Sequence, residues 1–226
     1  MRSARSHPGA LAPLLTDPTA TRARAWWSDH MEGPLYWSPT GTAGDSLCQL
    51  DPAAARTGAQ GLLLRSRTTG ATTGDIIEGT ATRPAVHPAA WDYRGYLRTP
   101  NIDRLSLLTF GANFLTASHT YQALLVYNIA THAWSIRKAG GSYQIIAGLT
   151  TVLASNTWYH VALSAQTTTL RYLAATVAAE TVDLTAYGLY DAGAGATEEV
   201  RAVLGATAAT DNPLTLYLDD VEVWRT

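Results

Sequence analysis

The sequence predicts an all-β fold made of two antiparallel sheets, and three observations lead to this prediction. The 226 residues include 11 Tyr and 7 Trp, together with many Thr and Val, which favour strands. The 18 Gly and 10 Pro interrupt the chain too often for long helices. After Trp91, short strand-like runs alternate with turn-forming residues at the spacing of a sandwich or barrel. We therefore expect one large β-sandwich over residues 25–226.

Residues 1–24 are expected to form an extended N-terminal arm outside the sandwich. They contain three prolines and little apolar periodicity, so they cannot bury enough apolar surface to fold alone. Leu11, Leu14 and Leu15 are the apolar residues through which such an arm would dock on a partner subunit. Pro13 interrupts the short apolar stretch of the arm, which makes it a poor secretion signal, and no run approaches the length of a membrane span.

The expected strands follow the arm in chain order. The aromatic-rich segment 25–37 predicts a first strand that enters the core, and residues 60–67 predict a second. Small and turn-forming residues dominate about 68–90, which predicts a long loop. The later strand-like runs are 93–98, 105–110, 123–127, 133–137, 143–147, 157–164, 170–174, 199–204 and 214–224.

The most informative local pattern is Asn-Thr-Trp-Tyr-His-Val-Ala-Leu-Ser over residues 156–164, followed by Thr-Leu-Arg-Tyr-Leu over 169–173. This pair resembles a hairpin of the concanavalin A-like and laminin G-like jelly rolls, and the resemblance implies a two-sheet antiparallel jelly roll. That family usually closes the next hairpin with Asp-Gly, whereas residues 174–176 here read Ala-Ala-Thr, so a longer or different connection is expected. His160 is interpreted as a packed histidine on a core strand.

The C-terminal run 214–224 does not keep a simple alternation. Leu216 and Leu218 share one face of the expected strand, but Val221 would fall on the other face. A β-bulge at residues 219–220 would restore the register and turn a carboxylate inward.

This closing pattern resembles the last strand of jelly-roll carbohydrate-binding modules. In those modules a glutamate of the first strand and an aspartate of the closing strand commonly bind a structural calcium. The resemblance implies Glu32, Asp219 and Asp220 as calcium ligands, since Ca²⁺ prefers oxygen ligands. The alternative is that these acids cap strand ends or pair with arginines.

The opening of the sandwich, from Glu32 through residues 36–45 to 56–64, is similar to the entry of lectin-like domains in bacteriophage structural proteins. Such proteins assemble in the host cytoplasm and leave by lysis, which fits the absence of a signal peptide. The resemblance implies location in a virion, and the alternative is an extracellular protein.

Composition argues against several function classes. A net charge of -2 with 15% charged residues provides no basic face for nucleic acid. Cys48 is the only cysteine, which excludes an intrachain disulfide. The acid pairs Asp75 with Glu78 and Asp220 with Glu222 do not match the crowded carboxylate pattern of lectin-fold glycosidases. The chain also has no nucleophile elbow and no phosphate-binding loop, so no enzymatic activity is expected.

Three functional hypotheses follow. The favoured one is a non-enzymatic virion structural protein, a capsid decoration or tail accessory, that docks on capsid or tail subunits through its arm, displays the jelly roll and forms homo-oligomers. The alternative is a carbohydrate-binding module or lectin, and the least favoured is a polysaccharide-cleaving enzyme. In a glycan-binding protein, exposed rings would stack on sugars, although a sandwich of this size also needs rings in its core. The candidate rings are Trp91, Tyr93, Tyr96, Trp134 and Tyr143, with Tyr187 and Tyr190 as further members.

Overall fold

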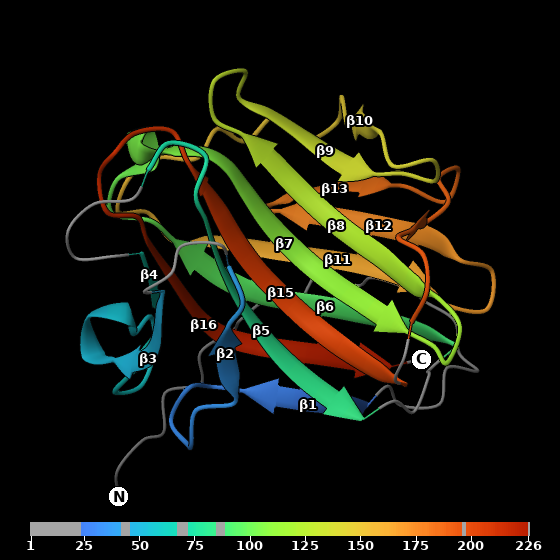
Figure 1. The fold of residues 1–226 in the computed structure, drawn as a ribbon, viewed down its shortest axis with the longest axis horizontal. Coiled ribbons are helices and arrows are strands. Elements are labelled where there is room, and N and C mark those ends of the chain that lie inside the picture. The colour runs from blue at the N-terminus through green and yellow to red at the C-terminus, as the bar shows by residue number, and fades with distance from the viewer. Residues whose placement is uncertain (1–23, 42–45, 67–71, 85–88, 196–197, 226) are drawn as a thin grey trace, which may run out of the picture.

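The computed structural model describes residues 24–41, 46–66, 72–84, 89–195 and 198–225. Two antiparallel sheets pack face to face, which confirms the predicted all-β sandwich (Figure 1). The proposed arm, with Leu11, Leu14 and Leu15, lies outside the described residues apart from Arg24. None of the described residues belongs to a helix with the length and hydropathy of a membrane span.

The described residues form two sheets of eight strands each. Sheet A has the order β13-β12-β11-β6-β16-β4-β3, with β1 also paired to β16. Its strands are β1 (Arg24–Asp29), β3 (Leu47–Asp51), β4 (Gly61–Arg65), β6 (Ala90–Arg98), β11 (Tyr159–Gln166), β12 (Arg171–Val177), β13 (Glu180–Asp183) and β16 (Thr215–Arg225).

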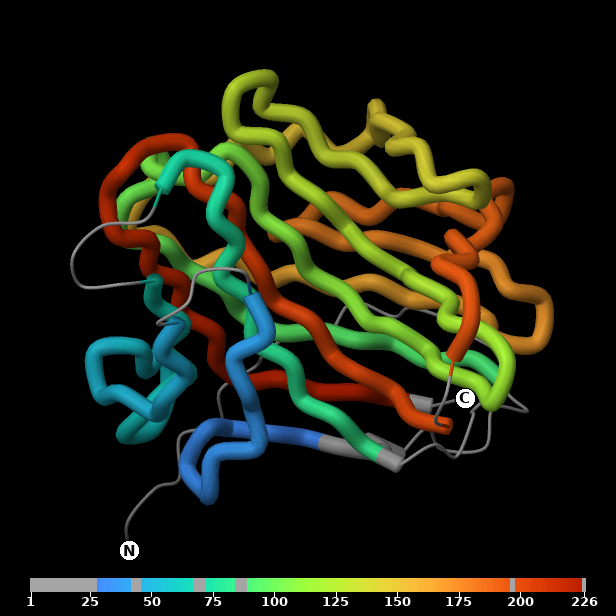
Figure 2. The backbone as a smooth tube through the Cα atoms, in the orientation of Figure 1, coloured from blue at the N-terminus to red at the C-terminus, as the bar shows by residue number. Residues whose placement is uncertain are grey.

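Sheet B has the order β10-β9-β8-β7-β15-β5-β2, with β14 also paired to β8. Its strands are β2 (Trp37–Pro39), β5 (Ile76–Pro84), β7 (Leu105–Leu115), β8 (Thr120–Asn128), β9 (Ala133–Arg137), β10 (Tyr143–Ile145), β14 (Tyr190–Asp191) and β15 (Glu199–Ala208). Two short 3₁₀ turns complete the regular elements, η1 (Pro52–Ala54) and η2 (Ile102–Arg104). Because the chain crosses between the sheets from β4 to β5, β5 to β6 and β6 to β7, the two layers form a jelly roll (Figure 2).

Aromatic rings join the two sheets across the core. Along β6 the burial alternates, so that Trp91 and Tyr93 point inward. The Tyr93 ring stacks on Phe110 of sheet B with 4.3 Å between centroids, and Trp91 lies 4.7 Å from Phe114. Such pairs add to the stabilisation that burial of the rings provides.

The predicted bulge in β16 is confirmed. The pairing of β16 with β6 shifts register between Asp219 and Glu222, and Asp220 adopts a positive φ of 50°. The extra residue returns Val221 and Val223 to the core. The expected inward turn of a carboxylate is wrong: Asp219 pairs with Tyr96 of the outward face, and its side chain is fully buried because the loop 56–60 covers it.

The predicted long loop over about 68–90 is wrong in its central part, because residues 76–84 form strand β5 inside sheet B. The inward positions of this strand are Ile77, Gly79 and Ala81. Gly79 must be small because a Cβ atom there would lie 2.6 Å from the Leu64 side chain. The strand therefore lacks the bulky alternation that usually marks a strand in sequence.

The connection after β12 is not longer than the family's hairpin turn, but its residues and position differ from those expected. Val177 pairs with Glu180, which leaves a two-residue turn at Ala178 and Ala179. Ala178 has a φ of +52°, the backbone conformation that glycine normally supplies in such a turn. The turn is therefore tight despite the missing Asp-Gly pair.

Candidate functional site

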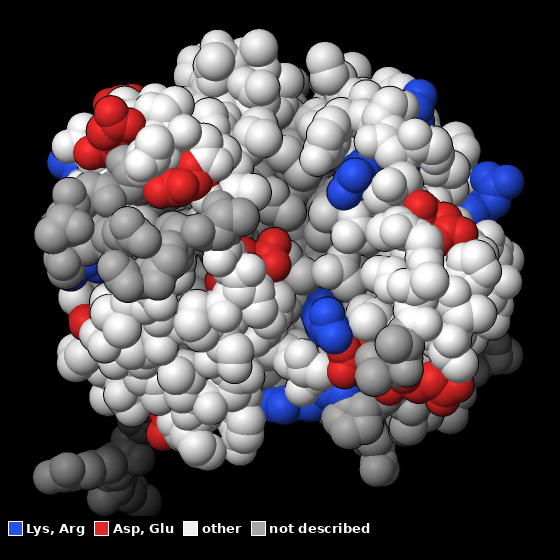
Figure 3. Space-filling view, in the orientation of Figure 1, with Lys and Arg blue, Asp and Glu red and all other residues white. Residues whose placement is uncertain are grey.

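A polar groove lies on the outer face of sheet B. It encloses about 380 Å³ and is lined by Ser38, Thr40, Glu78, Thr80, Thr82, Asn113, Glu199 and Arg201. Figure 3 shows this face, which is hollowed near its middle and carries acidic and basic side chains around the hollow.

Strand pairing brings the groove residues together from distant parts of the sequence. Glu78, Thr80 and Thr82 alternate along β5, so their side chains share the outer face. Arg201 of β15 pairs with Thr82 on one side and with Asn113 of β7 on the other. A row of polar groups therefore crosses three adjacent strands.

Glycines keep the floor of this face low. Gly205 pairs with Glu78 in the β15–β5 ladder and has no side chain to fill the space beside it. At Gly111 of β7 a Cβ atom would lie 2.1 Å from the carbonyl oxygen of Ala123, so only glycine allows β7 and β8 to approach as they do.

The charges in the groove do not balance. The Arg201 guanidinium forms an ion pair with Glu199, which neutralises both groups. Glu78 accepts a hydrogen bond from the Thr40 hydroxyl to Oε1 at 2.9 Å, which is the only side-chain interaction found for it within the described part of the chain. Glu78 therefore contributes an uncompensated negative charge.

The polar row continues onto β8 and β9. Asn113 pairs with Gln122, whose Oε1 accepts a hydrogen bond from Arg137 Nη1 at 2.7 Å. The Arg137 guanidinium also lies 4.0 Å from the centroid of the Tyr190 ring. Hydroxyl, amide and charged groups thus extend across most of the sheet, a surface suited to a ligand rich in hydrogen-bonding groups.

Most of the predicted sugar-stacking rings do not lie in this groove. Trp91, Tyr93 and Trp134 are at most 2% exposed, so their selection as ligand-binding rings is wrong: the core needs their apolar area. Tyr96 lies on sheet A, where the Arg56 guanidinium covers its ring at 3.5 Å. Tyr143 is 53% exposed on the edge strand β10.

The two further candidate rings, Tyr187 and Tyr190, already pack against other side chains. Tyr187 is partly buried and packs against the core, and Tyr190 lies beneath the guanidinium of Arg137. The sequence pattern that does mark the groove is the Glu-x-Thr-x-Thr alternation of residues 78–82, which falls in the segment interpreted as a loop.

The three residues predicted as calcium ligands do converge, on the loop 56–60. Asp219 Oδ2 accepts hydrogen bonds from the backbone N–H groups of Arg56 at 2.7 Å and Thr57 at 3.0 Å. Glu32 Oε1 accepts from the backbone N–H groups of residues 59 and 60. Asp220 forms an ion pair with Arg56 at 3.0 Å and accepts a hydrogen bond from the Thr57 hydroxyl.

These contacts do not fit a calcium cage. N–H donors and a guanidinium approach the carboxylate oxygens from the side that a cation would occupy. The described residues contain no group of three or more His, Cys, Asp or Glu side chains arranged to hold a metal ion. Burial raises the pKa of the Asp219 carboxyl above its usual value, while the three backbone N–H bonds act in the opposite direction. These contacts agree with the alternative interpretation, in which the acids cap backbone N–H groups or form ion pairs with arginines.

The acidic pairs noted in the sequence have hydrogen-bond partners of their own. Asp75 accepts a hydrogen bond from the Thr72 N–H within a turn, and Glu222 accepts one from the Trp224 indole on sheet A. Within the groove, Glu78 pairs with Gly205 and is therefore six positions along β15 from Glu199. At about 3.3 Å per residue this places their backbones roughly 20 Å apart, well beyond the separation of glycosidase carboxylates.

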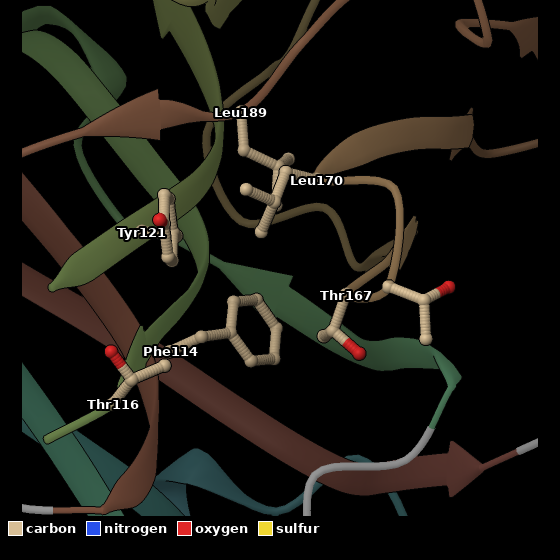
Figure 4. Close-up of a pocket in the computed structure, with 7 residues that line it drawn as sticks. Phe114, Thr116, Tyr121, Thr167, Leu170 and Leu189 are labelled. Atoms are coloured by element: carbon tan, nitrogen blue, oxygen red, sulfur yellow. The ribbon is translucent and has the colours of Figure 1, made fainter. Parts of the chain in front are cut away.

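A second, apolar pocket of about 190 Å³ opens at one end of the sandwich. The side chains of Phe114, Tyr121, Leu170 and Leu189 surround it, and threonines line its rim (Figure 4). Beside this pocket, the His119 ring stacks on Tyr121, and His119 Nδ1 lies at hydrogen-bonding distance, 2.9 Å, from Asp191 Oδ2. Its small size and apolar lining make it less suited to a hydrogen-bonding ligand than the groove.

Comparisons with known proteins identify the fold. No family model and no curated protein sequence matches the chain. Among solved structures, a carbohydrate esterase from the Shiga toxin-encoding bacteriophage phi24B has a TM-score of 0.54 at 14% identity, and the match covers 90% of this chain and 99% of that one. A carbohydrate-binding module of the β-sandwich superfamily has a TM-score of 0.50 at 10% identity, with 84% and 57% covered.

A sialidase has a TM-score of 0.51 at 12% identity over 84% of this chain, but the match spans only 17% of the sialidase. These likenesses confirm the predicted two-sheet antiparallel jelly-roll sandwich. At such low identities they establish the architecture alone.

Proposed function

We propose that this protein is a non-enzymatic glycan-binding jelly roll and that the groove on sheet B is its binding site. The observation that carries this proposal is a groove of about 380 Å³ whose described lining residues all carry a hydroxyl, amide, carboxylate or guanidinium group. Sugars are recognised by such groups when several of them are fixed on rigid strands. The carbohydrate-binding module with the same architecture supports this assignment.

What supports binding without cleavage is the distribution of carboxylates. Glu78 and Glu199 lie roughly 20 Å apart along the strands, and Glu199 is held by Arg201. Hydrolysis of a glycosidic bond needs two carboxyl groups about 5–9.5 Å apart across the sugar. The described groove residues therefore offer groups that would hold a glycan, and the distance between their two carboxylates supports binding over cleavage.

The test is a glycan microarray followed by titration calorimetry on the best ligand. Asn113→Ala and Thr82→Val remove groove groups, and we expect each to weaken binding about tenfold, as loss of a buried hydrogen bond does. Thr176→Val is the matched control, because Thr176 bonds Thr181 on sheet A. If the wild type binds no glycan, the function is wrong. If the control weakens binding and the groove variants do not, the site is wrong.

A virion role is a second proposal, in which residues 1–24 dock the sandwich on capsid or tail subunits. What supports it is the match to nearly the full length of a bacteriophage protein. Full-length protein carrying Leu11→Ser, Leu14→Ser and Leu15→Ser is compared with the wild type by light scattering, alone and with purified phage capsids or tails. We expect the triple variant to lose assembly or docking while keeping its glycan affinity, and equal behaviour of the two proteins would contradict the proposal.

A further inference from the structure

The charge of the groove restricts the class of glycan that it takes. Of the described residues that line it, Glu78 and Glu199 are acidic and only Arg201 is basic. Because Arg201 is paired with Glu199, one negative charge remains, at Glu78. An anionic sugar seated here would face this charge without a cation to receive it.

Arg137 is the nearest basic group along the polar row, and it does not compensate Glu78. It lies on β9, four strands from β5 in the order β9-β8-β7-β15-β5. At about 4.8 Å per strand the two positions are roughly 19 Å apart. This exceeds the Debye length of about 8 Å at physiological ionic strength, so Arg137 is screened from a ligand beside Glu78.

Glu78 is placed to accept hydroxyl groups. Among the described residues, Thr40 donates to Oε1 and none donates to Oε2, so Oε2 and the remaining lone pairs are available to a ligand. A carboxylate accepts two neighbouring hydroxyls of a pyranose at once, and such charge-assisted bonds are stronger than neutral ones. Thr80 and Thr82 follow on the same wall of the groove and offer further hydroxyls.

None of the described residues that line the groove is aromatic. Recognition therefore depends on hydrogen bonds more than on ring stacking, which increases the weight of the one free carboxylate. Building on the proposed function, we infer that the groove selects neutral sugars through bidentate hydrogen bonds to Glu78 and excludes uronic and sialic acids.

The test uses ligand pairs that differ only at C6: galacto- and gluco-oligosaccharides against their galacturonate and glucuronate counterparts. Calorimetry at pH 7 and 0.15 M salt should show binding of the neutral member at least tenfold tighter in each pair that binds. Glu78→Gln should weaken neutral binding about tenfold and reduce this discrimination, because a neutral amide replaces a charged acceptor. Asp103→Asn, an exposed acid in η2 outside the groove, removes the same charge and should change neither.

Two results would overturn the inference while leaving the proposed function standing. One is tighter binding of the uronate member, and the other is unchanged affinities in Glu78→Gln while Asn113→Ala still weakens binding. Absence of binding to every member would overturn both. Melting curves of each variant show whether it remains folded, and Gln at position 78 keeps the shape of Glu.

Discussion

The Asp219 carboxylate is expected to hold the loop 56–60 onto the C-terminal strand, and Asp219→Ala should release it. The buried carboxylate accepts three backbone N–H groups, from Arg56 at 2.7 Å, Thr57 at 3.0 Å and Asp220 at 2.8 Å. A hydrogen bond to a charged group contributes about 1.5–3 kcal/mol, and a buried donor left without an acceptor costs about 1–3 kcal/mol. Because the three bonds share one group and water re-enters in part, we expect a loss of about 3–5 kcal/mol.

For a chain of this length such a loss corresponds to a decrease in melting temperature of roughly 10 °C. Urea unfolding at pH 7, followed by tryptophan fluorescence, measures the free energy directly. Asp219→Asn should cost less, because its carbonyl oxygen still accepts. Asp103→Asn should cost nothing measurable.

The same measurement with and without calcium distinguishes the N–H clamp from a metal site. Since the carboxylates of Glu32 and Asp219 already receive N–H donors, added CaCl₂ or EDTA should leave the wild-type melting temperature unchanged. A loss below 1 kcal/mol in Asp219→Ala would refute the clamp. Stabilisation of the wild type by calcium that Asp219→Ala abolishes would show that the carboxylate serves an ion.

Three further predictions concern other parts of the fold. Ala178→Gly should stabilise the protein by about 0.5–1 kcal/mol in urea unfolding, because glycine adopts the positive φ of this turn without the Cβ penalty, and destabilisation would contradict the assigned turn. Hydrogen bonds from Thr150 and Thr151 lower the pKa of Glu180 from 4.5 to about 2. The ionised Glu180 carboxylate therefore adds stability above pH 4.5, and this stability is lost as the pH falls towards 2. Glu180→Gln should flatten the pH dependence of the free energy of unfolding in that range, and an unchanged slope would contradict the lowered pKa. Burial raises the pKa of the Cys48 thiol to about 12, so native protein at pH 8 should react with a thiol reagent far more slowly than protein in urea, and equal rates would refute this.

The strands after Trp91 were predictable because their sequence alternates and their ends carry turn residues. The bulge at residues 219–220 was predictable for a related reason, since the alternation fails there and an inserted residue is the simplest repair. The strand β5 was missed because its inward residues Gly79 and Ala81 are small, which gives no apolar signal. The same misreading hid the groove, whose wall is the outward face of that strand.

The choice of sugar-stacking rings failed for a reason that the sequence contains. Trp91 and Tyr93 share an alternation with Leu97, so all three belong to the inward face of β6, whereas Tyr96 belongs to the outward face. Aromatic content alone does not distinguish core from surface, but phase along a strand does. The convergence of Glu32 with Asp219 was predictable from a family resemblance, whereas the backbone N–H donors that meet them have no sequence signature.

The outer faces of the two sheets differ in how completely their polar groups are used. On sheet A the Arg56 guanidinium covers the Tyr96 ring, and Arg94 bonds Asp92 at 2.5 Å. Rings and cations on that face are therefore already matched, and a ligand would have to displace these contacts. On sheet B, one oxygen of Glu78 receives no hydrogen bond from the described residues, so a ligand gains hydrogen bonds there without breaking an ion pair. This difference in unused hydrogen-bonding capacity is why the groove on sheet B is the stronger candidate for glycan binding.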